Sequence, residues 1–153
     1  MRGLYFDELK IGGTYKTGGI TITEDSIIEF ALKYDPQYFH IDREAAKKSI
    51  FGELVASGFQ IYALSFRVIY DSGFLLHNLG GNAADELRWL KTVKAGDTLS
   101  VNMEVINLRP LSSRPDRGLV RMKYVAVNQL DEPVLSYLMP HFFKRKTDAP
   151  TGG

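Results

Sequence analysis

The sequence predicts an α+β protein in which a curved antiparallel sheet wraps one long apolar helix. The first observation is the segment Phe59–Tyr70, where apolar side chains recur on every face, so a helix formed here must be surrounded by other elements. The second is an alternation of apolar and polar residues after residue 84, which is typical of half-buried strands. The third is the order of these patterns, because helices followed by hairpin-linked strands indicate an antiparallel sheet.

The N-terminal third predicts one strand and two helices ahead of the apolar helix. Glycines punctuate a strand near Thr14–Ile22. Thr23 is the expected N-cap of a helix whose apolar residues recur at helical spacing. Asp35, which precedes a proline, ends this helix because that position is biased away from the α region. Asp42 is a second expected N-cap, and it opens a short helix over Arg43–Ser49.

The C-terminal half predicts four strands. The clearest runs through Leu99–Val105, where apolar and polar residues alternate. Further alternating runs cover Leu119–Asn128 and Val134–Phe143, and the polar sequence Asn128–Pro133 predicts the hairpin connection between them. An earlier strand is expected at Glu86–Lys91.

Composition narrows the classes of function. The chain has 153 residues, a length that predicts one domain, and no repeat or linker divides it. It contains no cysteine, which excludes disulfides, thiolate metal sites and cysteine nucleophiles. Its 19 basic and 18 acidic residues give a net charge of +1, which argues against a nucleic-acid partner. No apolar run predicts a signal peptide or a membrane span, so the expected location is the cytoplasm.

An acid and an imidazole lie five residues apart where the first helix is expected to end. Asp35 and His40 occupy a loop, and loops between rigid elements concentrate catalytic groups. A carboxylate can orient an imidazole or share a water with it, and histidine is the usual group for proton transfer near neutral pH. The alternative is structural, with Asp35 capping its helix and His40 partly buried in the loop. The three histidines lack the spacing of a local zinc site, so no metal is predicted.

Two further candidates stand just before the apolar helix. Gly58 would present its backbone N–H at the positive end of the helix dipole, where it can hold an anion or a developing oxyanion. The alternative role of Gly58 is to give room for close packing. Ser57 is the expected N-cap of the helix and a candidate for contact with substrate. The single tryptophan, Trp89, is expected in the core.

Arginines gather in a segment that is expected to form a loop between two strands. Arg109, Arg114 and Arg117 lie in this segment, and guanidinium groups suit phosphate. The functional interpretation is therefore contact with a phosphate-bearing ligand. The alternative is a solvated edge of the sheet.

The segment 34–58, followed by the apolar helix, resembles the MaoC-like dehydratases and (R)-specific enoyl-CoA hydratases of the hotdog fold. The hydratase motif of that family runs Asp, any residue, Asn, Pro, an aliphatic residue and His. Asp35 and His40 keep its spacing, whereas Gln37 and Tyr38 replace the Asn and Pro.

The resemblance implies one MaoC-like hotdog domain within residues 1–153, with its core at about 5–145, a short polar C-terminal tail and pairing into a homodimer or a multiple of one. It implies a hydro-lyase of fatty acid metabolism that hydrates a 2-enoyl thioester of coenzyme A or an acyl-carrier protein, with Asp35 and His40 activating the water. The Gly58 N–H would polarise the thioester carbonyl. No metal or redox cofactor is implied, because coenzyme A enters as part of the substrate.

Two other functions stay open at this point. A hotdog acyl-CoA thioesterase would attack the thioester carbon instead of the β-carbon, although the spacing of Asp35 and His40 matches the hydratase motif. A non-catalytic module would bind an acyl thioester without converting it, and the altered pair Gln37 and Tyr38 keeps this alternative open.

Overall fold

The structure is a computed structural model, and it describes residues 2–146. It confirms the expected α+β class, and most of the predicted polar tail lies outside the described residues. In chain order the elements are η1 (Phe6–Glu8), β1 (Thr14–Lys16), β2 (Ile20–Thr21), α1 (Glu24–Tyr34), α2 (Tyr38–Ile41), α3 (Arg43–Ala46), α4 (Gly58–Asp71), η2 (Phe74–His77), β3 (Asp85–Trp89), β4 (Thr98–Pro110), β5 (Arg117–Val127) and β6 (Pro133–Lys144).

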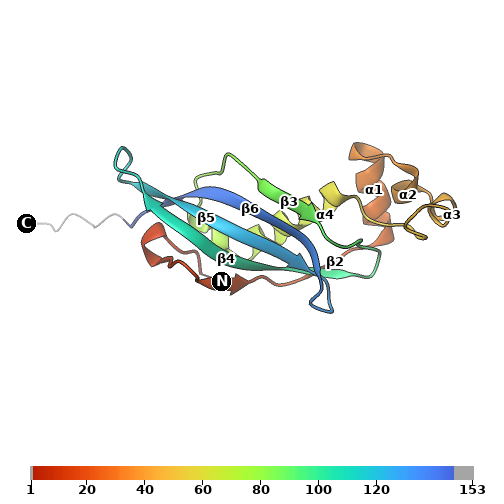
Figure 1. Cartoon of the computed structure of the whole chain (residues 1–153), viewed down its shortest axis with the longest axis horizontal. Coiled ribbons are helices and arrows are strands. Elements are labelled where there is room, and N and C mark those ends of the chain that lie inside the picture. The colour runs from red at the N-terminus through yellow and green to blue at the C-terminus, as the bar shows by residue number, and fades with distance from the viewer. Residues whose placement is uncertain (1, 147–153) are drawn as a thin grey trace, which may run out of the picture.

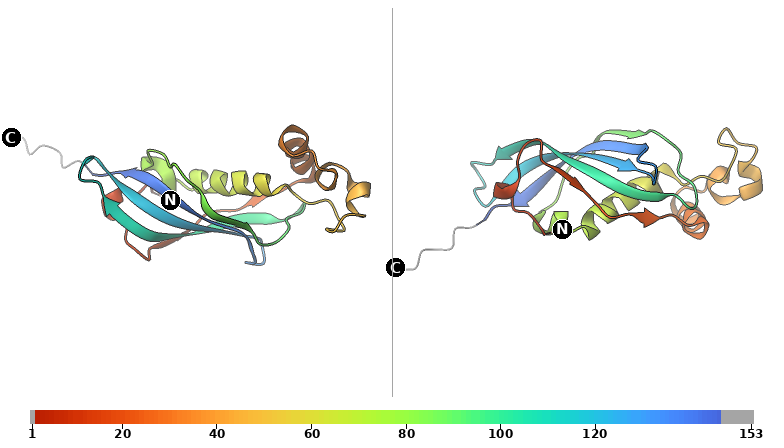
Figure 2. Two further views of the ribbon diagram at one scale, coloured as in Figure 1. Left: turned by 45° about the horizontal axis from the view of Figure 1, so that its top comes forward. Right: turned by 90° about the horizontal axis from the view of Figure 1, so that it is seen from below.

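One antiparallel sheet forms the body of the molecule, and α4 lies along one face of it (Figures 1 and 2). The strand order is β1-β4-β5-β6-β3, and β2 pairs separately with β4. Alternate residues of β4 and β5 are almost completely buried, and they are Leu99, Val101, Met103, Val105, Val120, Met122, Tyr124 and Ala126. The alternation in the sequence therefore marks the face that forms the core. The helices α1, α2 and α3 gather at one end of the sheet (Figure 1).

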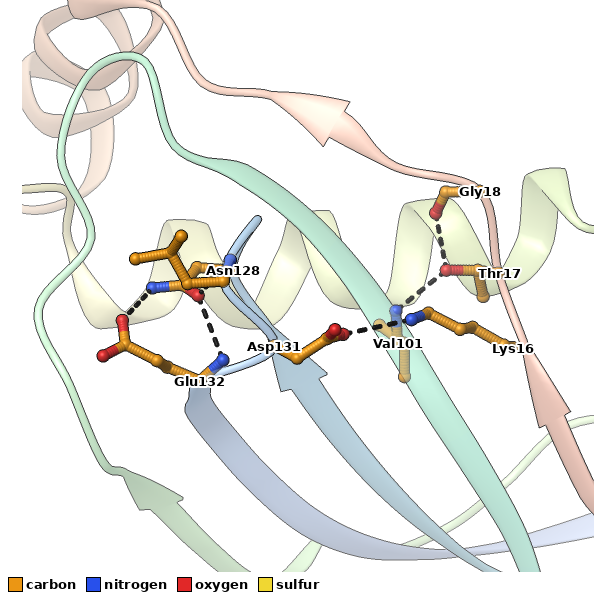
Figure 3. A network of polar contacts seen from close by, with 8 residues as sticks. Lys16, Thr17, Gly18, Val101, Asn128, Asp131 and Glu132 are labelled. Carbon is orange, nitrogen blue, oxygen red and sulfur yellow. Dashed lines mark hydrogen bonds and ion pairs between the residues drawn. The ribbon is translucent and has the colours of Figure 1, made fainter.

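The predicted strand at residues 14–22 is broken into β1 and β2, which is a correction to the expectation of one continuous strand. At the break, Thr17 N–H donates to Val101 O at 3.0 Å. Val101 N–H in turn donates to the Thr17 hydroxyl at 2.9 Å (Figure 3). That hydroxyl in turn donates to Gly18 O at 2.6 Å. A side-chain oxygen thus replaces a backbone partner in the ladder, because threonine hydroxyls compete with secondary structure for backbone donors.

The hairpin between β5 and β6 falls where the sequence predicts it. The side-chain oxygen of Asn128 accepts from the N–H groups of Leu130 and Glu132, at 2.9 and 3.1 Å, while its amide donates to the Glu132 carboxylate at 2.7 Å. Asp131 occupies the left-handed region with φ 57°, and its carboxylate pairs with Lys16 of β1 at 3.1 Å (Figure 3). The turn is therefore stabilised by local side-chain hydrogen bonds, which is why sequence chemistry alone locates it.

The predicted helix caps at Thr23 and Asp42 are both formed. The Thr23 hydroxyl accepts from Ser26 N–H at 3.2 Å, and the Asp42 carboxylate accepts from Ala45 N–H at 2.9 Å. The helix that Asp42 opens is shorter than the predicted Arg43–Ser49, since α3 ends at Ala46. The helix α2 was not predicted; it places His40 on a short helix rather than a loop.

The expectation that other elements surround the apolar helix on every side is wrong for a single copy of the chain. Ile61, Val68 and Ile69 of α4 are buried, whereas Phe59 is 60% exposed and Tyr70 is 65% exposed. The sheet covers one face of α4 and leaves an apolar stripe open. In the part of the chain that the structure describes, no helix combines the length and apolar character needed to cross a bilayer.

Candidate active site

The end of α1, the short helix α2 and the start of α4 bring an acid and an imidazole into contact. Asp35 is the C-cap of α1, and its N–H donates to Ala31 O at 2.9 Å. Pro36 follows and turns the chain into α2, which carries His40. The Asp35 Oδ2 and His40 Nε2 atoms lie 3.3 Å apart, and both side chains are largely buried. The five-residue spacing thus becomes a direct contact.

The tautomer of His40 follows from its second contact. His40 Nδ1 lies 2.6 Å from Val55 O. A carbonyl oxygen only accepts, so Nδ1–H is the donor and the other nitrogen of a neutral ring carries a lone pair. That lone pair faces the carboxylate of Asp35. Two acceptors in contact are relieved by a donor that reaches both, and a water molecule has two O–H groups to offer.

An irregular segment at residues 53–57 fixes the position of the His40 imidazole. Val55, which accepts from the ring, donates its own N–H to Phe39 O at 3.2 Å. The next residue, Ala56, donates to Val93 O at 2.7 Å. The ring position therefore depends on this irregular segment and on the loop that follows β3.

The carboxylate of Asp35 is held on both oxygens. Ser57 Oγ donates to Oδ2 at 2.7 Å, and Gln37 Nε2 donates to Oδ1 at 2.8 Å. Burial of Asp35 opposes ionisation, yet the hydrogen bonds from Ser57 and Gln37 hold the pKa of its carboxyl below the usual value. Asp35 is therefore an anion at neutral pH.

The structure gives Ser57 a different place from the predicted contact with substrate. Ser57 is completely buried, so it presents no surface to a ligand. Its hydroxyl accepts from Phe59 N–H at 3.2 Å, which confirms the predicted N-cap, and donates to Asp35. Sequence reasoning missed this second contact. The sequence offered one signal for this contact, which is that Ser57 directly precedes the glycine that begins the apolar helix. The acid within its reach, Asp35, ends an earlier helix.

A cavity of about 460 Å³ opens beside the Asp35 and His40 pair. Gly58, the first residue of α4, also lines this cavity. Among residues 2–146, no acceptor takes the Gly58 N–H. Besides these three residues and Gln37, the lining consists of Phe39, Phe51, Val55, Ala56, Phe59, Ile61, Trp89, Leu90, Lys91 and Thr92. An anion, an imidazole and a free N–H thus meet at a largely apolar cavity.

Comparison with known proteins identifies the family. Residues 8–126 match the model of the MaoC like domain. The chain belongs to the MaoC-like family. It is 31% identical over 140 residues to the uncharacterized protein YdeM of Bacillus subtilis, a match that covers 91% of this chain and 98% of YdeM.

Solved structures agree with this assignment of the MaoC-like chain. The MaoC-like dehydratase from Rhodospirillum rubrum is 33% identical with a TM-score of 0.88, over 95% of this chain and 99% of that one. The R-hydratase PhaJ1 from Pseudomonas aeruginosa is 24% identical with a TM-score of 0.72, over 99% of this chain and 96% of that one, and this likeness shows the shared fold alone. The resemblance to the MaoC-like family and the hotdog fold are confirmed.

The tryptophan of this MaoC-like chain is not in the core, which corrects the expectation from sequence. Trp89 ends the edge strand β3 and is 48% exposed at the cavity. Its indole N–H donates to Gly58 O at 2.8 Å. Because β3 has no neighbour on its outer side, its last side chain folds over the start of α4 instead of into the sheet.

The predicted arginine segment lies away from this site in one copy of the MaoC-like chain. Arg109 belongs to β4 and Arg117 to β5, so the connecting loop is shorter than expected. The hairpin they form stands at the end of the sheet opposite α1, α2 and α3 (Figure 1). Arg117 pairs with Asp116 at 2.7 Å. The structure does not bring Arg109, Arg114 and Arg117 to the cavity, and their contact with phosphate stays a prediction.

The other two histidines of the MaoC-like chain have structural surroundings. His77 stacks on Tyr5 with 3.7 Å between ring centroids. His141 is buried in the core against Tyr124. Within residues 2–146 no group of three or more His, Asp or Glu side chains could hold a metal ion.

Proposed function

We propose that this protein hydrates a 2-enoyl thioester reversibly to a 3-hydroxyacyl thioester. The observation that supports this most is the contact of the His40 lone pair with the Asp35 carboxylate at the cavity. A water on the cavity side of this contact donates one O–H to each acceptor. Its oxygen is then aimed at a bound ligand by two fixed groups, which is the positioning that water addition requires.

Proton transfer follows from the tautomer of His40. As the water oxygen bonds to the β-carbon, Nε2 accepts its proton, while Asp35 stays ionised and stabilises the imidazolium that forms. The electron pair of the C=C bond moves to the thioester oxygen, where the Gly58 N–H stabilises the enolate. The imidazolium then returns the proton to the α-carbon, and the balance is one water added to one enoyl thioester. Dehydration is the reverse.

The substrate and location complete the proposal. Coenzyme A or an acyl-carrier protein would carry the acyl group, so no separate cofactor is required in this scheme. The largely apolar cavity beside Asp35 and His40 supports an acyl group as the part of the substrate that the protein binds. A cytoplasmic location stays the prediction drawn from the sequence, and cell fractionation would check it.

The direct test is a panel of 2-enoyl-CoA thioesters of increasing chain length, followed by loss of enoyl absorbance. We expect turnover for at least one chain length, and a kcat lowered by about 10²-fold or more with Asp35→Asn or His40→Ala. Release of free thiol from saturated acyl-CoA, with no hydration, would replace the proposal by a thioesterase. Binding of every thioester without conversion would replace it by the binding module.

A second copy of the chain is the partner we propose. The apolar stripe of α4 that carries Phe59 and Tyr70 is open, and β3 stands unpaired at the edge of the sheet. Exposed apolar stripes and free strand edges are usually covered. We expect sedimentation at micromolar concentration to give the mass of a dimer or a multiple of it, and a monomer mass would contradict this.

A further inference from the structure

The first residue of α4 is held by the indole of Trp89. The Nε1–H of Trp89 donates to the carbonyl oxygen of Gly58, the first residue of α4, at 2.8 Å. A Cβ placed on Gly58 would lie 2.5 Å from both Nε1 and Cε2 of the indole, far inside contact distance. The ring therefore rests directly on the bare Cα of the glycine. Phe59 closes the other side, with its ring edge-on to the indole and 5.5 Å between centroids.

A glycine at this position needs such a restraint. Glycine has the widest backbone freedom of any residue, and a single helical hydrogen bond, from Ile61 N–H to Ser57 O at 3.1 Å, holds the peptide group that carries the Gly58 N–H. On the N-terminal side, the buried hydroxyl of Ser57 caps the helix. On the other side, Trp89 holds the carbonyl. Between these two restraints, the N–H of Gly58 has no acceptor among residues 2–146.

The restraint reaches the body of the sheet. Trp89 is the last residue of β3, and the next two N–H groups, of Leu90 and Lys91, both donate to Val134 O at 2.8 and 3.4 Å. Val134 belongs to β6, is completely buried and sits next to the hairpin. The backbone that follows Trp89 is thus anchored to β6, while the indole ring reaches over the edge of the sheet to the start of α4.

We propose that Trp89 is a positioning residue that fixes the direction of the Gly58 N–H and thereby orients the carbonyl of a bound acyl thioester. This rests on the proposed function only in taking an acyl thioester as the ligand. Trp89 acts through Gly58, and the glycine is required because any side chain there would displace the indole. Trp89 and Phe59 are thus part of the site that binds the thioester carbonyl.

The experiment measures recognition of the carbonyl without turnover. Butanoyl-CoA has a thioester carbonyl and no double bond to hydrate, while S-butyl-CoA lacks the carbonyl. Calorimetry of the wild-type protein should give about tenfold tighter binding of butanoyl-CoA, the size expected for one well-placed hydrogen bond. In Trp89→Phe this preference should fall to about twofold, with the affinity for S-butyl-CoA unchanged.

A second variant removes the indole donor without changing the shape of the ring. The chain contains one tryptophan, so growth of a tryptophan auxotroph on benzothienylalanine replaces Trp89 alone, with sulfur in place of N–H. It should lose the preference as Trp89→Phe does, at an unchanged melting temperature. Tyr70→Phe, which removes one exposed hydroxyl from the far end of α4, is the matched control and should keep the full preference.

The outcomes separate this proposal from the proposed function. A wild-type protein that prefers butanoyl-CoA but hydrates no enoyl-CoA would remove the hydratase and leave the role of Trp89 in place. A wild-type protein with no preference, or with no binding of either ligand, would overturn the role of Trp89. Full preference in both Trp89 variants would overturn it as well.

Discussion

Two buried histidines, His40 and His141, have the same tautomer in two different surroundings. His40 is 5% exposed and His141 is 1% exposed. In the core, His141 Nδ1 lies 3.3 Å from Asn78 Oδ1, and its Nε2 accepts from the Tyr124 hydroxyl at 2.8 Å. Both rings therefore carry the proton on Nδ1. The Nε2 of His141 finds a neutral donor inside the protein, whereas the Nε2 of His40 faces the carboxylate of Asp35.

This contrast distinguishes a structural histidine from a candidate catalytic one. Burial is common to both rings, so burial alone carries no functional information. Every hydrogen-bonding group of His141 is satisfied within the fold, as most buried polar groups are. The lone pair of His40 is left without a donor next to an open cavity, and the missing donor has to come from solvent or ligand. A water site is thus defined by what the protein leaves unpaired.

The largest expected effect is the loss of turnover when the unsatisfied pair is changed. His40→Ala and Asp35→Asn should each lower kcat by about 10²-fold or more, since positioned acid–base groups contribute on that scale. The double variant should be about as slow as either single variant, because the two groups act as one unit. Steady-state kinetics on the best enoyl-CoA, with circular dichroism to verify folding, would measure this. Substantial activity in folded Asp35→Asn would show that Asp35 is not the catalytic carboxylate.

The core histidine should instead control stability against acid. Burial lowers the pKa of His141 to about 4, whereas an unfolded histidine titrates near 6.5. The unfolded state therefore binds the proton first, so the stabilisation is complete above pH 6.5 and is lost as the pH falls towards 4. The total is about 3 kcal/mol.

Urea unfolding at a series of pH values checks this expectation. His141→Gln should flatten the dependence of the free energy of unfolding on pH between 6.5 and 4, while leaving kcat at neutral pH nearly unchanged. A variant that keeps the wild-type slope would show that other groups carry the acid sensitivity.

A smaller effect is expected for Asp42, the acid nearest to the pair along the sequence. Asp42 caps α3 and lies outside the cavity lining. Asp42→Ala should lower the free energy of unfolding by about 1 kcal/mol, the usual value of an N-cap, and leave kcat intact. Thermal melts and kinetics on the same preparation would test it. Lost activity in a folded Asp42→Ala protein would contradict the division between capping and catalytic carboxylates.

The smallest effect is expected at the distant hairpin. If Arg114 and Arg117 meet coenzyme A phosphates, their replacement by alanine should raise KM by a few-fold, about the value of exposed charge contacts, and leave kcat alone. The salt dependence of KM should also become flatter. An unchanged KM in the double variant would identify the hairpin as a solvated edge of the sheet.

Local chemistry explains which parts could be predicted from the sequence. The caps at Thr23 and Asp42 and the turn at Asn128 depend on residues within a few positions of each other, and all three are formed. The strands β4, β5 and β6 were recognisable because alternate residues on one face are buried, over the first half of β4 and most of β5 and β6. The spacing of Asp35 and His40 also survives as a direct contact, because only a short turn separates them.

The missed features join distant segments. Ser57 reaches Asp35 across 22 positions, and Trp89 reaches Gly58 across 31. Neither residue carries a local pattern that points to its partner, since only the packing of α1 and β3 against α4 brings them together. The uncovered stripe of α4 was missed for a related reason. A sequence that is apolar on every face does not say whether its own chain or a second copy covers it.

The irregular segment at residues 53–57 ties the proposed catalysis to a part of the fold that lies outside the sheet ladder. It fixes His40 through the Val55 carbonyl, yet it belongs to neither a helix nor a strand ladder. Residues 54–57 are buried, but single backbone hydrogen bonds to Phe39 and Val93 hold the segment in place of a continuous ladder, so we expect it to open locally at a lower free energy than the core strands. Heating should therefore release the imidazole of His40 before the sheet unfolds. Activity would be lost below the temperature at which the sheet unfolds, and it would return fully on cooling.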